Sequence, residues 1–75
     1  MKKVVVYSSD QCTYCTTVKE YLKENKIEFI EKNIKASENR KELMARGFMS
    51  VPVILVDDNE ILGFDKDRLD TLLEI

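Results

Sequence analysis

Histidine is absent from this sequence of 75 residues, and its absence excludes several kinds of catalytic site. Without imidazole there is no Cys–His nucleophile pair, no Ser–His–Asp triad and no mixed Cys/His zinc site within one chain. The two cysteines cannot complete a four-ligand metal site alone, so we expect no bound metal.

Long apolar runs and an excess of positive charge are lacking as well. No apolar stretch approaches the roughly 20 residues that span a bilayer, and the run 4–7 is too short for a signal peptide. A net charge of −2 provides no basic field that would attract nucleic acid. We therefore expect a single domain over residues 1–75, monomeric and cytoplasmic, with no membrane or nucleic-acid partner.

The apolar residues that are present follow two periods, which predict strands alternating with helices. Short β-branched runs indicate strands at 3–7, 27–34, 51–56 and 60–62. Apolar positions spaced by three and four indicate helices at 12–25, 38–46 and 65–73. In the first helix this stripe holds Tyr14, Cys15, Val18, Tyr21 and Leu22. Ser37 is expected to cap the second helix, and Gly47 to end it.

The resulting order, β-α-β-α-β-β-α, predicts an α/β fold. The first β-α-β unit requires two parallel strands joined by a right-handed crossover, and the later hairpin adds antiparallel strands. Because strands 3–7 and 51–56 are apolar throughout, helices must cover both faces of the sheet.

The sequence Cys12-Thr13-Tyr14-Cys15 lies where the first strand passes into the first helix. Residues three apart at a helix start have Cα atoms about 5–6 Å apart, which suits a disulfide. Backbone N–H groups and the helix dipole favour a thiolate at Cys12 and so lower its pKa. Cys15 falls on the buried stripe, so we expect Cys12 to be the attacking nucleophile and Cys15 the resolving thiol. Two buried core cysteines, or half of a metal site, are the alternatives.

Pro52 stands at the entrance of the third strand. A cis Val51-Pro52 bond would leave the Val51 backbone accessible to an extended peptide. Because only about 5–6% of X-Pro bonds are cis, the residues alone favour a trans bond.

Three motifs together resemble the glutaredoxin family of the thioredoxin fold, and the resemblance covers essentially the whole chain. They are Cys12-Thr13-Tyr14-Cys15, Ser50-Val51-Pro52, and Gly63-Phe64 before an acidic helix start. The resemblance implies a four-stranded mixed sheet flanked by three helices and a cis Val51-Pro52 bond. It implies a thiol–disulfide oxidoreductase that acts on protein disulfides or glutathionyl mixed disulfides, with glutathione as reductant or substrate. The implied substrate-binding residues are Thr13, Tyr14, Val51, Pro52, Gly63, Phe64 and Asp65.

Several positions depart from the pattern of glutathione-using members. Thr13 replaces a common proline, Ser9 replaces a common lysine, and Gly63-Phe64 replaces a Gly-Gly pair. The spacing of Gly63, Phe64 and Asp67 is more similar to redoxins that supply ribonucleotide reductase and are reduced by thioredoxin reductase. Thioredoxin reductase is therefore an alternative partner to glutathione. If glutathione does bind, Asp65 is a candidate partner for its ammonium, and Arg40 or Lys41 for a carboxylate.

Two other classes of function stay open at this point. Two chains that each supply Cys12, with glutathione thiols, would complete an iron–sulfur site. Alternatively, the chain is an interaction protein that uses a sheet edge or its acidic C-terminal part, with incidental cysteines.

Overall fold

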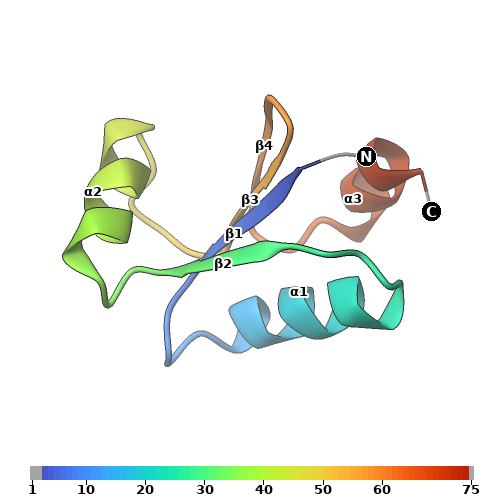
Figure 1. Cartoon of the computed structure of the whole chain (residues 1–75), viewed down its shortest axis with the longest axis horizontal. Coiled ribbons are helices and arrows are strands. Elements are labelled where there is room, and N and C mark those ends of the chain that lie inside the picture. Colours follow the sequence, from blue (N-terminus) through green and yellow to red (C-terminus); the bar gives the residue numbers. More distant parts are fainter. Residues whose placement is uncertain (1–2, 75) are drawn as a thin grey trace.

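The computed structural model describes residues 3–74, in which seven elements follow the predicted order (Figure 1). The four strands are β1 (Val4–Ser8), β2 (Ile30–Asn33), β3 (Val53–Val56) and β4 (Asn59–Leu62). The three helices are α1 (Thr13–Glu24), α2 (Ser37–Ala45) and α3 (Lys66–Leu73). The element order predicted from the sequence is confirmed.

The strands form one mixed sheet in the order β2-β1-β3-β4. Strand β1 pairs in parallel with β2, placing Val5 opposite Ile30, and antiparallel with β3, placing Val5 opposite Leu55. Strands β3 and β4 form the expected antiparallel hairpin. Every residue of β1 and β3 is buried, because these two strands are central and covered on both faces.

Helices cover the two faces of the sheet unequally (Figure 1). Helices α1 and α3 pack on one face, where Val18, Leu22 and Leu69 join the inward side chains of three strands in the larger core cluster. Helix α2 packs on the other face, where Leu43 joins Val5 and Tyr7 in a smaller cluster. The α/β prediction of two covered faces is confirmed.

Strand β2 is shorter than predicted, because the end of α1 uses part of the expected strand. Lys26 has a positive φ of 56°, and the Ile27 N–H donates to the Leu22 carbonyl at 2.9 Å. This left-handed residue followed by a six-to-one hydrogen bond is a Schellman-type helix ending. Ile27 and Phe29 still pack against the larger core cluster, so their alternation reflected burial rather than strand pairing.

The two ends of α2 give one wrong and one confirmed prediction. Ser37 is the first helical residue, and Ala36 is the N-cap without any side-chain hydrogen bond. The Ala36 carbonyl already accepts from the Arg40 N–H at 3.2 Å, so the helix begins one residue earlier than a serine cap would require. Gly47 follows the helix with φ of 88°, which a glycine adopts without steric cost, and ends it as predicted.

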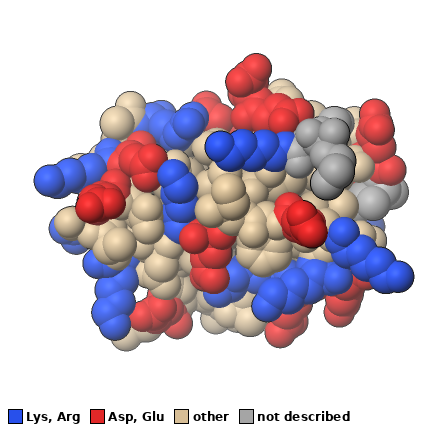
Figure 2. All heavy atoms as spheres, in the orientation of Figure 1, with Lys and Arg blue, Asp and Glu red and all other residues tan. Residues whose placement is uncertain are grey.

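Charges of both signs lie interspersed over the face shown in Figure 2. Ion pairs among residues 3–74 include Lys32–Glu42 at 3.0 Å between β2 and α2 and Lys66–Asp70 at 2.8 Å within α3. None of the helices in the described part of the chain has the length and apolar character needed to cross a bilayer.

Candidate redox-active site

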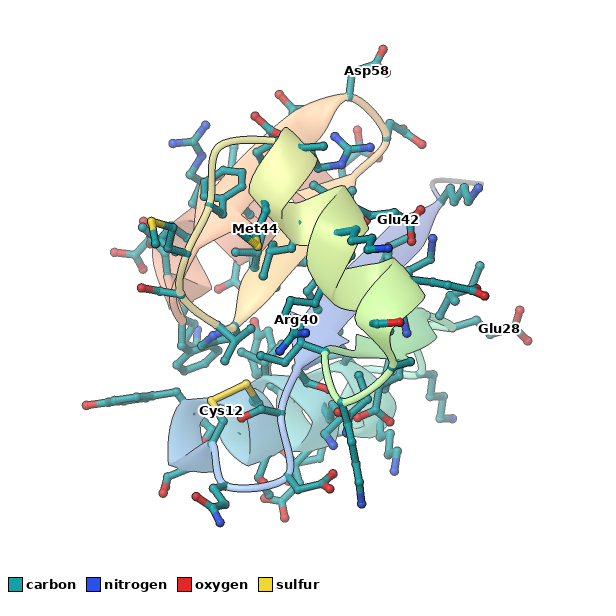
Figure 3. The ribbon with its side chains drawn as sticks, turned by 90° about the vertical axis from the view of Figure 1, so that its left-hand side faces the viewer. Cys12, Glu28, Arg40, Glu42, Met44 and Asp58 are labelled. Atoms are coloured by element: carbon teal, nitrogen blue, oxygen red, sulfur yellow. A yellow bond between two sulfur atoms is a disulfide. The ribbon has the colours of Figure 1, made fainter. Side chains whose placement is uncertain are left out.

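Cys12 and Cys15 form a disulfide at the N-terminal end of α1, shown in yellow in Figure 3. Their Cα atoms are 5.2 Å apart, within the range predicted from the helical spacing. Cys12 is the N-cap residue, and its backbone has left the helical conformation at φ −102° and ψ 108°. Its Sγ accepts a hydrogen bond from the Cys15 N–H at 3.1 Å, so the helix start already directs an amide at this sulfur.

The two cysteines differ sharply in exposure. Cys15 is 0% exposed and belongs to the buried side of α1 together with Val18 and Leu22. Cys12 is half-buried, at the junction between a surface turn and the helix. Only Cys12 therefore presents a sulfur that another molecule can approach without disturbing the core.

A tight turn leads from β1 into Cys12. The Cys12 N–H donates to the Ser9 carbonyl at 3.4 Å, which closes the turn over Asp10 and Gln11. The Asp10 carboxylate points across to the end of β2, where it accepts a hydrogen bond from Asn33 Nδ2 at 2.7 Å. The chain before Cys12 is thus attached to a second segment 23 residues away.

A groove lies beside this helix start, with a volume of about 430 Å³. Its lining brings together three segments that are far apart in the sequence: Tyr14, Ser50, Val51, Pro52, Leu62, Gly63 and Phe64. The Val51-Pro52 bond is cis, as the resemblance implied and contrary to the expectation from the residues alone. No charged side chain is among these lining residues.

Five of the seven predicted substrate-binding residues line this groove: Tyr14, Val51, Pro52, Gly63 and Phe64. Thr13 and Asp65 do not line it. Thr13 is the exposed first residue of α1, and Asp65 is the N-cap of α3, where its Oδ1 accepts from the Arg68 N–H at 3.2 Å. Tyr14 is 67% exposed, so its assignment to the buried stripe of α1 was wrong and its place beside the site is the observed one.

Phe64 is held in the groove wall by a contact with Tyr21 of α1 and by packing against the larger core cluster. Its ring packs edge-on against Tyr21 of α1, with ring centroids 5.6 Å apart. The Lys66 ammonium lies 5.8 Å from the Tyr21 ring centroid and pairs with Asp70 on α3. This part of the groove is therefore fixed by the packing of α1 against α3.

The charged side chains proposed for glutathione lie on α2. Arg40 and Lys41 are both exposed, and in Figure 3 Arg40 extends from α2 toward the end of the molecule that carries Cys12. Neither residue is among those that line the groove.

One carboxylate near this end of the sheet has a shifted pKa. Hydrogen bonds from Lys19 Nζ and from Ser8 Oγ, both at 2.7 Å, lower the pKa of Glu31 from its ordinary value of 4.5. Ser8 is fully buried at the end of β1, and Lys19 belongs to α1. Glu31 therefore links β1, β2 and α1.

The sequence analysis missed three residues that shape this site: Leu62, Asp10 and Asn33. Leu62 has a detectable signal, since its neighbour Ile61 is 2% exposed and strand alternation then turns Leu62 outward. Asp10 and Asn33 are 23 residues apart, and nothing in the sequence pattern pairs them.

Comparison with known proteins supports the assignment that the fold and the motif suggest. The family model described as glutaredoxin matches residues 4–61. A glutaredoxin-like 8.6 kDa protein encoded in the rubredoxin operon of Clostridium pasteurianum is 38% identical over 73 residues, covering 95% of this chain and 97% of that protein. The glutaredoxin-like protein NrdH of Lactococcus lactis is 39% identical over 67 residues, covering 88% of this chain and 93% of its own length.

Among solved structures, the glutaredoxin-like NrdH-redoxin of Escherichia coli superimposes with a TM-score of 0.84 at 25% identity, with 93% of each chain covered. That protein is described as having a thioredoxin-like activity profile. A matching family model over most of the chain, two relatives near 40% identity and the Cys12–Cys15 disulfide of this chain support a thiol–disulfide redox role. The chain belongs to the glutaredoxin family.

Proposed function

We propose that the chain reduces protein disulfides, with Cys12 as nucleophile and Cys15 as resolving thiol. In the reduced protein, the Cys12 thiolate attacks one sulfur of a substrate disulfide and displaces the other substrate sulfur as a thiolate. Cys15 then loses its proton and attacks the Cys12 sulfur of the mixed disulfide. The second substrate thiolate leaves, and the Cys12–Cys15 disulfide forms, so two electrons pass to the substrate.

The unequal exposure of the two sulfurs carries this proposal. Cys15 is 0% exposed, whereas Cys12 is half-buried at the helix start. The Cys12 Sγ accepts a hydrogen bond from the Cys15 N–H at 3.1 Å. A helix N-terminus stabilises an anion there, which favours ionisation of Cys12 over Cys15. The buried sulfur of Cys15 can react only with a mixed disulfide already formed at Cys12, which is the role of a resolving thiol.

Trapping of the mixed disulfide tests these roles. The Cys15→Ser variant should form a stable covalent adduct with a disulfide-containing protein such as insulin, and mass spectrometry should locate it at Cys12. The Cys12→Ser variant should form no such adduct. Stable adducts through Cys15 in the Cys12→Ser variant would reverse the assignment.

We propose further that electrons arrive from a flavoprotein of the thioredoxin reductase class rather than from glutathione. Glutathione carries two carboxylates and one ammonium, yet the groove lining contains no charged residue, and Asp65 already caps α3. The large exposed side chains of the groove lining are mainly apolar, with Tyr14 67% and Leu62 58% exposed, and the exposed Ser50 lies beside them. Such a surface suits contact with a protein better than with a charged tripeptide. The relatives named NrdH and the Gly63-Phe64 motif favour the same branch of the family.

A coupled assay discriminates between the two reductants. NADPH oxidation in the presence of insulin should be faster with thioredoxin reductase than with glutathione and glutathione reductase. Faster turnover with glutathione would contradict this choice of reductant without affecting the roles of the two cysteines. Ribonucleotide reductase is the recipient that the redoxin resemblance suggests, and the same assay with that enzyme in place of insulin tests it.

A further inference from the structure

The segment that precedes Cys12 is held by a polar contact that the redox mechanism described above does not use. Asp10 lies in the turn closed by the Cys12 N–H and the Ser9 carbonyl. Its Oδ1 accepts a hydrogen bond from Asn33 Nδ2 at 2.7 Å, and Asn33 is the last residue of β2. We call this contact the Asp10–Asn33 clamp.

Asn33 is rigidly placed for this role. Its Oδ1 accepts the Lys35 N–H at 2.8 Å, which fixes the orientation of the side-chain amide and directs its NH₂ group toward Asp10. Its own carbonyl accepts from Asn39 Nδ2 at 2.9 Å, so α2 holds the same residue. The adjacent Ile34 N–H donates to the Ser8 carbonyl at 2.8 Å. The donor side of the clamp is therefore attached to β1 and α2 and cannot follow a moving turn.

The acceptor side, by contrast, is supported by little else. Asp10 is exposed, and its second contact is an ion pair with Lys35 at 3.7 Å, in which the two side chains are 61% and 83% exposed. An ion pair this exposed contributes little. The hydrogen bond from Asn33 is thus the shorter of the two side-chain contacts that Asp10 makes among residues 3–74, and it joins the turn before Cys12 to the end of β2.

We propose that Asp10 and Asn33 are positioning residues for Cys12: the clamp holds the turn so that the Cys12 sulfur stays at the helix N-terminus and the Asp10 charge stays turned away from it. This inference rests on the proposed redox role of Cys12. Without the clamp, the turn moves and the Cys12 sulfur loses part of its alignment with the N–H groups of α1. Aspartate is also a favourable N-cap residue, so a released Asp10 carboxylate competes for the same donors.

Among the described residues, few charged groups other than the Glu31–Lys19 pair held by Ser8 lie near this turn, so the effect of the clamp on Cys12 can be measured. The first turn of α1 has no acidic residue, and the groove lining has no charged side chain. Lys35 faces Asp10 from the segment after β2, and Arg40 extends from α2 toward this end of the molecule. Asp10 is thus the acidic group of the turn itself, and its position affects the stability of a thiolate at Cys12.

Two substitutions at position 10 separate the hydrogen bond from the charge. Asp10→Asn removes the charge but keeps an oxygen that accepts from Asn33, whereas Asp10→Ala removes both. Because the two variants are equally neutral, a difference between them does not arise from the charge at position 10. The measurement is the rate of iodoacetamide alkylation at Cys12 in the reduced protein as a function of pH, with labelled peptides identified by mass spectrometry.

At neutral pH we expect Asp10→Ala to be alkylated at Cys12 about threefold more slowly than Asp10→Asn, as the loss of one hydrogen bond permits. Asn33→Ala should slow alkylation at least as much, because it also releases a charged Asp10. Asn25→Ala is the matched control, since it removes an asparagine hydrogen bond to the Tyr21 carbonyl at the other end of α1. This control should lose some stability and leave the pH profile of Cys12 unchanged.

Equal pH profiles for Asp10→Ala and Asp10→Asn would overturn the clamp proposal. The proposed redox role would survive that result, provided that wild-type Cys12 ionises below the ordinary range of a thiol. An ordinary pKa for Cys12 in the wild-type protein would instead contradict the redox role itself, whatever the order of the variants. Position 10 is exposed, so both of its variants are expected to fold even if Asn33→Ala does not.

Discussion

The two ends of helix α1 satisfy their free backbone groups in different ways. At the C-terminal end the chain caps itself: Lys26 turns left-handed, the Ile27 N–H reaches the Leu22 carbonyl, and Asn25 Nδ2 reaches the Tyr21 carbonyl. At the N-terminal end the side-chain cap is the Cys12 sulfur, which accepts from the Cys15 N–H. Sulfur is a weak acceptor when neutral.

Under the proposed redox role, this difference accounts for the reactivity expected at Cys12. The hydrogen bonds of the self-capped end involve no sulfur, so we expect them to stay unchanged when the disulfide opens. At the sulfur-capped end, the hydrogen bond from the Cys15 N–H becomes strongest when Cys12 is an anion, because the amide then donates to a charge. A helix start whose side-chain cap is a neutral sulfur in the oxidised protein is therefore expected to favour the thiolate in the reduced one.

Among the substitutions that test the difference between the two helix ends, the largest effect on activity is expected at Cys12. Cys12→Ser should abolish disulfide reduction, because the oxygen of serine at its ordinary pKa is not a nucleophile for disulfides. Serine is a good N-cap residue, so the fold should persist. Asn25→Ala at the other end should retain wild-type turnover in the same insulin assay. Substantial turnover by Cys12→Ser would refute the site assignment.

Both ends depend on the buried middle of α1, and its loss should be the largest effect on stability. Leu22 is 0% exposed in the cluster between α1, α3 and the sheet. Leu22→Ala should lower the free energy of unfolding by about 2–5 kcal/mol, from lost burial and the cavity that remains. Urea denaturation followed by circular dichroism measures this. A loss under about 1 kcal/mol would mean that the core packs differently.

A glycine at the C-terminal end of α1 should, in contrast, raise stability. Lys26 has φ of 56°, a conformation that costs a residue with a side chain about 1 kcal/mol. Lys26→Gly should therefore raise the free energy of unfolding by roughly that amount and leave the reactivity of Cys12 unchanged. Lys23→Gly, inside the helix, is the matched control and should lower it by about 1 kcal/mol. Destabilisation by both substitutions would show that the left-handed cap is not formed.

The smallest expected effect concerns Glu31 and acid pH. Because hydrogen bonds from Lys19 and Ser8 lower the pKa of Glu31 in the folded chain, its charge stabilises the fold above the ordinary pKa of 4.5. That contribution disappears as the pH falls through the lowered pKa of the folded state. Wild type should therefore exceed Glu31→Gln in thermal stability at neutral pH, and the difference should shrink below about pH 4.5. The charge is partly exposed, so a small difference is expected. If the difference in thermal stability between wild type and Glu31→Gln instead grew toward acid pH, the stabilising role of the Glu31 charge would be contradicted.

Local patterns in the sequence predicted most of the fold. The runs at 3–7 and 51–56 predicted buried strands because β-branched residues there face core on both sides. The spacing of Cys15, Val18 and Leu22 predicted the buried side of α1. The ends of elements were less accurate, since the sequence does not show that Ile27 completes a helix cap rather than a strand.

The site was predictable where its chemistry is local in sequence and not where contacts are distant. Cys12 and Cys15 were found because three residues at a helix start fix their separation. The cis Val51-Pro52 bond came only from the family resemblance, because the residues alone favour trans. The Asp10–Asn33 clamp joins a turn to the end of β2, and only the folded sheet brings the two together.

The pH dependence of Cys12 alkylation in the reduced wild-type protein tests the central claim most directly. If the start of α1 stabilises an anionic sulfur, the apparent pKa of Cys12 should lie below about 8.5, the value of a free cysteine, and below that of Cys15. Cys12 should also be labelled first at neutral pH. An apparent pKa of Cys12 at or above the free value, with both sulfurs labelled at similar rates, would contradict the account.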